Sequence, residues 1–463
     1  MNMTKLKKRR TLFLLLSSTV LFAACAVGPT HKPPVAIIAE RWYAPLPHAG
    51  SSAKLAEFWA QWNDVALTTL VEAAQKSNTN IEQASARIAQ ARATATIVGS
   101  GAWPGVNGSA SAYRGNQGTG AATVNSGSLQ AAWELDFFGA NRRSRDAAAA
   151  RVDARNFDWH DARVSIAAEV ATAYTSLRVN QLLMVGFERD AQSRADTARL
   201  TMLKTNAGFE APANAALADA AKAEANTRVA NQRAEIDIGV KGLVALTGLS
   251  EPNVRTLVAP TGKTFAPLPS LTVAQVPADV LSQRPDLASS ERELAAAIAD
   301  IGGAEADRYP KISLTGSIGY SATRAFGMTA DGATWGFGPS ISIPIFDAGR
   351  RAATVELAKA RHAELLASYK AIAIRAVREV EEALTRIESV RARETDQLAS
   401  LAGYETFAKA AEARLKVGAG SVLELEDARR AVLGAQVNVL TLERERAHAW
   451  ISLYRAAGGG WTK

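Results

Sequence analysis

P-S-I-S-I-P-I-F-D-A-G-R-R, residues Pro339 to Arg351, is the stretch that decides the fold. Its first half alternates apolar with small residues, the period of a β-strand, and it breaks at a turn around Phe346 to Gly349. Beyond Arg350 the chain becomes rich in alanine, with the period of a helix. A strand therefore passes into a long helix here.

The same change of period occurs about 208 residues upstream, in W-E-L-D-F-F-G-A-N-R-R from Trp133 to Arg143. Other pairs keep a similar spacing: Trp103-Pro104 corresponds to Tyr309-Pro310, and the break at Gly208 corresponds to Leu415 to Ser421. Repeated spacing of this kind indicates a tandem duplication of about 210 residues. Strand-to-helix junctions are then expected at Phe138, Gly139 and Arg142, and again at Phe346, Gly349 and Arg350.

Four strands are predicted, at about 104–114, 128–138, 310–321 and 334–346, with loops at 115–127 and 321–333 between them. Leu129, Trp133 and Leu135 alternate with polar or small residues, and Trp335, Phe337 and Ile341 do the same. Alternation over about ten residues is typical of an outer-membrane barrel strand, although a soluble antiparallel sheet has the same pattern.

Four strands cannot close a barrel, and an open edge in lipid leaves backbone groups without hydrogen bonds. Oligomerisation is therefore required. Two chains would supply eight strands and three would supply twelve with a wider lumen, and this arithmetic alone does not choose between them.

The helical sequence from Ala348 to Val417 would extend roughly 105 Å at 1.5 Å per residue. Helices expected at 80–100 and 212–246 together approach the length of the long helix 141–205. Two short helices stacked end to end beside one long helix would give a hollow helical barrel. A solid coiled coil is the alternative, but it would require more Leu and Ile at the contact positions. A proline-rich linker from Glu251 to Pro277 separates the two halves.

The first residues indicate export. Five basic residues precede an apolar run from Leu12 to Ala24, and Leu21 to Ala24 resembles a lipobox before Cys25. We expect a lipoprotein signal peptide over 1–24, a lipid on Cys25, and a tether over 25–54. An ordinary cleaved signal followed by a bystander cysteine is the alternative. Ala26 in place of an aspartate favours the outer membrane.

Composition argues against other classes of function. Loss of the signal leaves about 48 Lys and Arg against 45 Asp and Glu, with no clustered basic face, so we expect no nucleic-acid partner. No metal, cofactor or catalytic site is predicted, because the five histidines lack metal-ligand spacing and no nucleotide or hydrolase motif has a suitable context. Those histidines are His31, His48, His160, His362 and His448.

Six motifs in order carry a family resemblance. They are C-A-V-G-P from Cys25, F-W-A-Q-W-N-D from Phe58, W-E-L-D-F-F-G from Trp133, Q-R-P-D-L from Gln283, I-P-I-F-D-A-G-R-R from Ile343 and A-A-G-G-G-W from Ala456. The chain resembles the TolC-like outer-membrane efflux proteins, in particular the NodT-type lipoproteins.

The resemblance implies a mixed α+β membrane protein: a homotrimer whose twelve-stranded β-barrel, four strands per chain, continues into a periplasmic α-helical barrel. Its repeats would span 55–262 and 263–463. It also implies an exit duct, without catalysis or cofactors, that works with a periplasmic adaptor and an inner-membrane transporter of the resistance-nodulation-division type. Pro344 would lie at the lower end of its strand, and Arg350 and Arg351 just below the lipid.

The resemblance further places gate acids in L-E-L-E-D-A, Leu423 to Ala428. Glu424 and Asp427 take the two acidic positions and share a helix face, so three copies would form rings of negative charge that favour cations. Glutamate replaces the family's first aspartate, which puts the gate's width in doubt. A capping box with Ser421, or a solvated face, is the alternative for Glu424.

The turns 204–211 and 415–421 are the expected adaptor-docking tips, with simple helix reversals as the alternative. Their named residues are Gly208, Gly418, Gly420 and Ser421. Two other functions share this architecture: the outlet of a type I protein secretion system, and a porin that works without a pump. The exported compound is not encoded in any motif.

Overall fold

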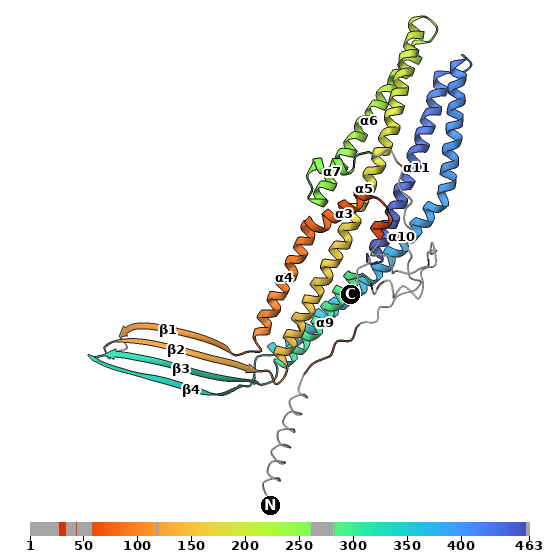
Figure 1. The fold of residues 1–463 in the computed structure, drawn as a ribbon. Coiled ribbons are helices and arrows are strands. Elements are labelled where there is room, and N and C mark those ends of the chain that lie inside the picture. The colour runs from red at the N-terminus through yellow and green to blue at the C-terminus, as the bar shows by residue number, and fades with distance from the viewer. Residues whose placement is uncertain are drawn as a thin grey trace, which may run out of the picture. The chain divides into compact units, whose positions relative to one another are not determined.

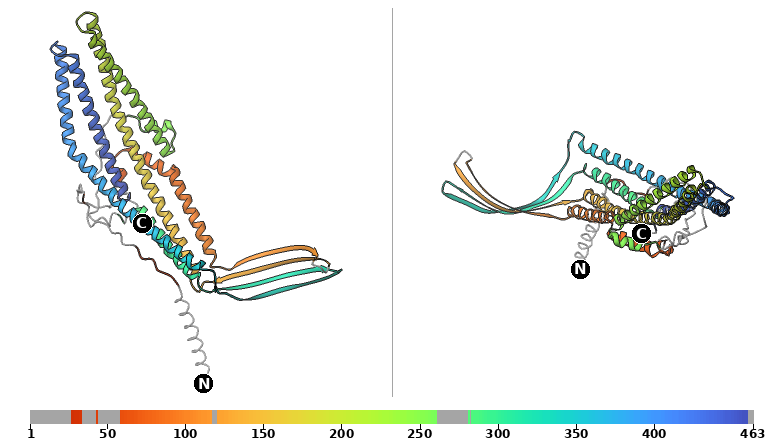
Figure 2. Two further views of the ribbon diagram at one scale, coloured as in Figure 1. Left: turned by 180° about the vertical axis from the view of Figure 1, so that it is seen from behind. Right: turned by 90° about the horizontal axis from the view of Figure 1, so that it is seen from above.

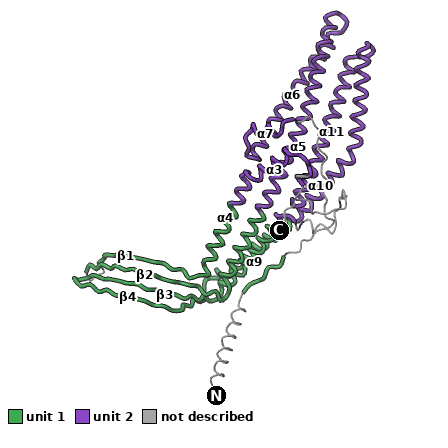
Figure 3. The backbone as a smooth tube through the Cα atoms, in the orientation of Figure 1, with its two compact units in different colours: residues 1–36, 86–157, 288–371 green, residues 37–85, 158–287, 372–463 purple. Residues whose placement is uncertain are grey.

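The computed structural model describes residues 27–33, 58–116, 120–260 and 283–459, together with Tyr43 and Leu281. The predicted signal peptide, Cys25, most of the tether and most of the linker lie outside the described residues. The chain divides into two compact units, each assembled from three segments of sequence (Figure 3). Unit 1 comprises 1–36, 86–157 and 288–371, and unit 2 comprises 37–85, 158–287 and 372–463.

Unit 1 contains one antiparallel sheet of four strands in the order β1-β2-β3-β4. The strands are β1 (Gly105–Asn116), β2 (Ala121–Leu135), β3 (Lys311–Ala325) and β4 (Met328–Ser342). They run side by side and curve together (Figures 1 and 2). The prediction of two strands from each repeat is confirmed.

The register gives this sheet one apolar and one polar face. Leu129, Ile318 and Trp335 form one row across β2, β3 and β4, and Trp335 is 82% exposed. On the other face Ser109 pairs with Ser128, with 2.9 Å between their hydroxyl oxygens. The alternation of apolar and polar residues in the sequence thus corresponds to the two faces of the sheet.

The predicted strand ends were wrong. Most of the expected loops 115–127 and 321–333 is strand, because pairing with a neighbouring strand satisfies the backbone of Gly, Ser and Thr residues despite their low strand propensity. At the opposite end β2 stops at Leu135 and β4 at Ser342, so Pro344 lies beyond the strand. Pro339 lies within β4, which pairs only with β3 in this sheet, the edge position where a missing donor is tolerated.

Two helices of 67 residues each dominate the chain, α5 (Ala140–Asn206) and α10 (Arg350–Lys416). The shorter helices are α2 (Phe58–Gln61), α3 (Val65–Ser77), α4 (Thr79–Ser100), α6 (Pro212–Thr247), α7 (Glu251–Leu257), α9 (Pro285–Ala306) and α11 (Val422–Ala456). Helix α7 corrects the predicted linker: Ser250 takes the cap position, a proline occupies the first turn and Val254 is buried. None of the described helices combines the length and apolar character needed to cross a membrane.

The short helices meet end to end in both repeats, as predicted. Asn78, just before α4, donates from Nδ2 to the carbonyl of Leu246 in the last turn of α6, at 2.8 Å. Arg284, just before α9, donates from Nη1 to the carbonyl of Ala456 at the end of α11, at 3.0 Å. In each repeat a polar side chain before one helix therefore caps the C-terminal carbonyls of the other.

The main hydrophobic core lies in unit 2, where helices from both repeats pack together. Phe58 stacks on Tyr454 with ring centroids 4.8 Å apart, and the Tyr454 hydroxyl donates to the carbonyl of Gly459 at 2.7 Å. Gly459 has no room for a side chain, since an added Cβ would lie 2.4 Å from Val164. The second family motif, which begins at Phe58, and the last, which begins at Ala456, thus meet in one core.

Candidate gate and docking turns of the helical hairpins

The two predicted docking turns have the same backbone structure. Gly208 and Gly418 both have φ 76°. The amide of Phe209 donates to the carbonyl of Lys204 at 2.8 Å, and the equivalent amide of Ala419 donates to Arg414 at 2.9 Å. The amides of Gly208 and Gly418 donate to the carbonyls of Thr205 and Leu415, at 3.0 and 3.1 Å. Together these contacts form Schellman motifs, in which a left-handed glycine ends the helix. The duplication is therefore exact enough to repeat its turn chemistry.

Both turns expose apolar side chains. Phe209 in the first turn is 83% exposed, and Val417 in the second is 78% exposed. Large apolar side chains at the end of a hairpin, outside any core, are typical of a contact surface.

The second turn leads into the predicted gate segment through a helix cap. Ser421 is the N-cap of α11, and its hydroxyl accepts from the amide of Glu424 at 3.1 Å. The Glu424 carboxylate pairs with Arg414 of α10, at 2.7 Å. Half of the capping box is thus formed, and the Glu424 side chain takes an ion pair across the hairpin instead of closing the box.

Glu424 and Asp427 both lie on the less buried face of α11. The Asp427 side chain is 57% exposed and pairs with Arg430 at 3.0 Å. Leu425 and Ala428, between and beside them, are buried in the core of this hairpin. The shared face expected of the two acids is confirmed, while their function as a gate stays a prediction.

Glu426, the third acid of the same motif, was not selected from the sequence. Glu426 is 2% exposed and points toward α5. Its carboxylate accepts a hydrogen bond from Nη1 of Arg194 at 2.6 Å. Arg194 is also 2% exposed and contacts both carboxylate oxygens of Asp190 at 3.0 Å. A fully buried charge is stable only with partners of this kind. The sequence places three acids, Glu424, Glu426 and Asp427, within one helical turn, and nothing in it indicates which of them is buried.

Further contacts extend this buried pair. Arg228 of α6 reaches Asp190 at 3.0 Å. Arg429 of α11 donates to the Thr197 hydroxyl at 2.6 Å and to Glu426 at 3.2 Å. We call Asp190, Arg194, Thr197, Arg228, Glu426 and Arg429 the hairpin network. It joins three helices from two repeats within unit 2.

The contact between Arg194 and Glu426 also shows how far the two turns are offset along the helices. Arg194 lies twelve residues before the end of α5, and Glu426 lies four residues after the start of α11. At 1.5 Å per residue these positions are about 18 Å and 6 Å from the helix ends, so along this contact the turns are offset by about 12 Å.

Four of the predicted junction residues, Phe138, Gly139, Phe346 and Gly349, lie between a strand and a long helix, whereas Arg142 and Arg350 lie in the first turns of α5 and α10. Gly139 and Gly349 have φ 85° and 86°. Asp136 accepts from the amides of Asn141 and Arg142 at 3.1 and 2.7 Å, which satisfies the first turn of α5. Asp347 does the same for Gly349 and Arg351, at 3.2 and 3.3 Å. The Asp of each junction motif is therefore a helix cap.

The segment just after the predicted lipidation site is seated in unit 1. The amide of Val27 donates to the carbonyl of Phe138 at 3.5 Å, and Arg143 donates to the carbonyl of Gly28 at 3.1 Å. Gly28 has φ 101°, and an added Cβ would lie 2.4 Å from the Cα of Gly302. His31 pairs with Glu291 at 2.6 Å. C-A-V-G-P thus contains a close glycine contact that its sequence alone did not reveal.

A charge cluster lies near the join of α9 and α11 in unit 2. Arg284 pairs with Asp286 and Glu379, both at 2.8 Å. Burial lowers the pKa of Arg284, but these carboxylates raise it above its ordinary value. Burial, followed by the charge of Asp286, raises the pKa of Asp161 to about 6. The pKa of this aspartate thus lies about two units above that of an ordinary aspartate.

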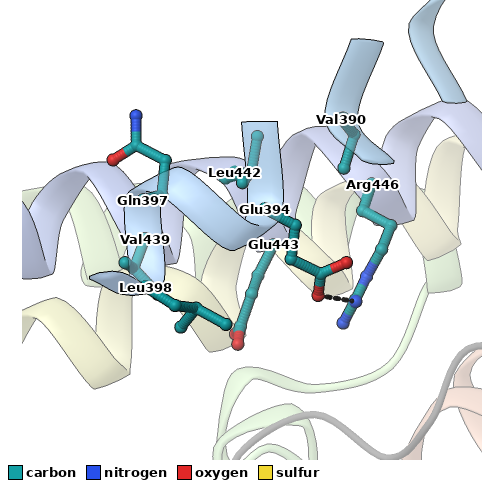
Figure 4. A pocket seen from close by; sticks show the side chains of 8 residues that line it. All are labelled: Val390, Glu394, Gln397, Leu398, Val439, Leu442, Glu443 and Arg446. Atoms are coloured by element: carbon teal, nitrogen blue, oxygen red, sulfur yellow. Dashed lines mark hydrogen bonds and ion pairs between the residues drawn. The ribbon is translucent and has the colours of Figure 1, made fainter. Parts of the chain in front are cut away.

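A small cavity lies between α10 and α11, lined by residues including Val390, Leu398 and Leu442 (Figure 4). Its volume is about 30 Å³, which admits a few water molecules and is too small for an exported compound. Arg446 pairs there with Glu394 at 2.9 Å, and burial raises the pKa of the neighbouring Glu443. The cavity is a packing feature of the hairpin.

Among the described residues no group of three His, Cys, Asp or Glu side chains could hold a metal ion. His448 Nε2 lies 3.1 Å from the Ser176 hydroxyl, and burial lowers its pKa. It is an interhelical residue.

Comparison with known proteins gives this architecture a family. The model of the outer membrane efflux protein family matches two segments, 70–249 and 276–459, which are the two repeats. The chain belongs to this family. It is an outer-membrane channel protein of an efflux system, and it extends into the periplasm.

Individual relatives agree over almost the whole chain. Outer membrane protein OprJ of Pseudomonas aeruginosa is 31% identical, covering 97% of this chain and 95% of its own. Nodulation protein T of Rhizobium leguminosarum bv. viciae is 29% identical, covering 96% and 92%. The open-state structure of the Neisseria gonorrhoeae MtrE channel is 26% identical and matches with a TM-score of 0.82, over 94% of this chain and 98% of that one.

Proposed function

We propose that this protein is the lipid-anchored, trimeric exit duct of a tripartite efflux pump and has no catalytic activity of its own. One observation carries the proposal: in both repeats a strand pair leads into a 67-residue helix that ends in an exposed Schellman turn. A protein with this architecture can span from the membrane to partners far below it.

Closure of a barrel by several chains is supported by the sheet. Strands β1 and β4 each pair with one neighbour within it, so each has an edge for a strand of another copy. Three copies would close a barrel of twelve strands, with the apolar row of Leu129, Ile318 and Trp335 toward lipid. Arg350 and Arg351 would then lie just below the lipid boundary.

The partners and the gate are assigned to the hairpin ends. The turns at 204–211 and 415–421 would contact a periplasmic adaptor, which connects the duct to an inner-membrane transporter of the resistance-nodulation-division type. Glu424 and Asp427 would line the closed end as rings of negative charge, because both side chains reach solvent on one face of α11. No cofactor is required, since the transporter supplies the energy.

The lipid anchor is assigned to Cys25. Val27 and Gly28 are held against Phe138 and Arg143, residues of the junction below the strands. Two residues of extended chain span about 7 Å, so a lipid on Cys25 would start close to this junction. Mass spectrometry of the purified protein tests the assignment, since an unacylated mature N-terminus at any other residue would contradict it.

Gene deletion tests the function itself. Loss of the duct should make cells accumulate the compounds that the partner transporter exports, and the intact gene should restore export. Unimpaired export together with reduced general permeability would instead identify a porin that works without a pump. Retention of one secreted polypeptide, with normal efflux of small compounds, would identify a type I secretion outlet.

A further inference from the structure

We propose that the helical wall of unit 1 carries a binding groove for small organic anions, between α4, α5 and α9. This inference rests on the proposed exit duct and adds a class of compound that the wall of the duct would hold. The groove has a volume of about 450 Å³. That volume lies within the range of small-molecule sites.

The lining comes from one face of each of two helices. Arg87, Gln90 and Ala91 lie three and four residues apart on α4, and Ala148 and Arg151 lie three apart on α5. Residues at these spacings share a helix face. The two faces therefore turn the same set of polar and small apolar side chains into the groove.

Positive charge exceeds negative charge in this groove. Its lining contains Arg87, Arg151 and Arg155 but a single acid, Asp300. Arg151 pairs with Asp300, and Arg155 pairs with Glu293 of α9 at 2.6 Å. Within the described part of the chain, the exposed Arg87 side chain has no carboxylate partner. Its guanidinium is therefore available to a ligand.

The chemistry of the lining defines the ligand. The Arg87 guanidinium presents paired N–H donors, the geometry that a carboxylate accepts, and the Gln90 amide beside it can donate as well. Ala91, Val98 and Ala148 supply an apolar floor for an aromatic or alkyl body. The groove therefore suits an ionised organic acid, whereas it would repel a cation.

The groove opens on the side of α9 away from the N-terminal tether. Glu291 of α9 pairs with His31 of the tether at 2.6 Å, whereas Glu293 pairs with Arg155 of the groove. Two residues along a helix are about 200° apart, so these two carboxylates point to nearly opposite sides. In the proposed duct the tether leads to lipid on the outside, so the groove opens into the tunnel, where exported compounds pass.

Binding of para-fluorobenzoate to the purified trimer in detergent, followed by fluorine NMR, tests the ligand class. We expect this anion to bind and the neutral para-fluorobenzamide, which has a similar shape, not to bind. Arg87→Gln should weaken binding by about 10-fold or more, through loss of a charge-assisted hydrogen bond. Arg92→Gln is the matched control, because Arg92 is an exposed arginine of the same helix outside the groove.

Gln90→Glu is a second variant, which keeps the size of the side chain and adds a negative charge beside Arg87. Gln90 is exposed, so the fold should not suffer, and binding should fall at least as far as in Arg87→Gln. Equal affinity in the wild type and both variants would overturn the groove. Equal binding of the benzamide would overturn the anionic class.

Thiol labelling of intact cells tests the opening into the tunnel. A maleimide on a polyethylene glycol too large for general porins should reach the new thiol of Gln90→Cys through the barrel. Arg92→Cys, nearly opposite on α4, should be labelled only after the outer membrane is permeabilised. Cys25 is the chain's single native cysteine, and its proposed lipid would block it. Gln90→Cys that is unlabelled in intact cells would overturn the opening into the tunnel.

Neither test depends on export, so the two proposals can fail separately. Unchanged binding in the groove variants, together with export that is lost on gene deletion, would overturn the groove alone. Unimpaired export after gene deletion would contradict the exit duct, whatever the binding results.

Discussion

Arg194 and Glu426, 232 residues apart in the sequence, form a buried ion pair of 2.6 Å between the two repeats. Asp190 completes the pairing of the arginine on its other side, at 3.0 Å. The first repeat thus supplies the cation and one acid, and the second repeat supplies the other acid. Packing of the two hairpins in unit 2 depends on a contact that neither repeat contains by itself.

Arg194→Met should destabilise the protein strongly. The substitution keeps a long side chain but leaves Glu426 and Asp190 buried with fewer partners, a loss of about 3–5 kcal/mol. The loss of stability is measured as a fall in the thermal midpoint of the purified trimer in detergent. Arg233→Met is the control, because the Arg233 side chain is 67% exposed and its ion pair with Glu188 is long, at 4.0 Å. Equal midpoints for the two variants would contradict the prediction.

Glu424→Ala/Asp427→Ala should raise single-channel conductance and lower the preference for cations. Both acids pair with arginines, Arg414 and Arg430, so their removal also leaves positive charge at the proposed constriction. Reversal potentials under a salt gradient report the selectivity directly. Traces and reversal potentials identical to those of the wild type would exclude both acids from the gate.

Asp161→Asn should change how stability depends on pH. The folded-state pKa of Asp161 is about 6 against its ordinary value of 3.8, so between these pH values the folded state holds a proton that the unfolded state has lost. Its contribution to stability is therefore present below about pH 4 and is lost as pH rises to about 6, at most about 3 kcal/mol. Thermal midpoints of the wild type and the variant should diverge over this range, with the variant the more stable at pH 7. A constant difference between them would contradict the assignment.

Gly28→Ala should detach the segment after the proposed lipidation site from unit 1. The residue has φ 101°, and the new methyl would meet the Cα of Gly302 at 2.4 Å, so strain and overlap together cost roughly 1–3 kcal/mol. Faster proteolysis near Val27 measures the release. Gly434→Ala is the matched control, since this helical glycine has open space around it and no positive φ. Equal cleavage in both variants would show that the close glycine contact does not hold the segment.

Ser421→Ala should cost about 1 kcal/mol through loss of the helix cap, and Ser421→Asp should restore it. The Ser421 hydroxyl accepts from the Glu424 amide at 3.1 Å, and an aspartate can accept the same hydrogen bond. Hydrogen exchange of the first turn of α11 is the measurement. Slow exchange in Ser421→Ala would mean that the turn is held by its Schellman bonds alone.

Much of this architecture could be predicted from the sequence because it depends on local periods. Alternation around Trp133 and Trp335 identifies the strands and their apolar face, and the alanine-rich stretches after Arg142 and Arg350 identify the long helices. Glycines at equal spacing, Gly208 and Gly418, identify the turns. Strand ends were predicted poorly, because pairing with a neighbouring strand overrides the low propensity of residues such as those at 121–127.

The candidate site divides in the same way. The sequence by itself determined that Glu424 and Asp427 share a helix face, since a spacing of three fixes that geometry within one helix. Only the tertiary structure decided that Glu426 is the buried acid, that Arg194 pairs with it, and that Gly28 meets Gly302. These contacts join residues more than 200 positions apart, and no local period records which distant side chain will lie opposite. Periodicity specifies the face of an element, whereas its partner is chosen by packing.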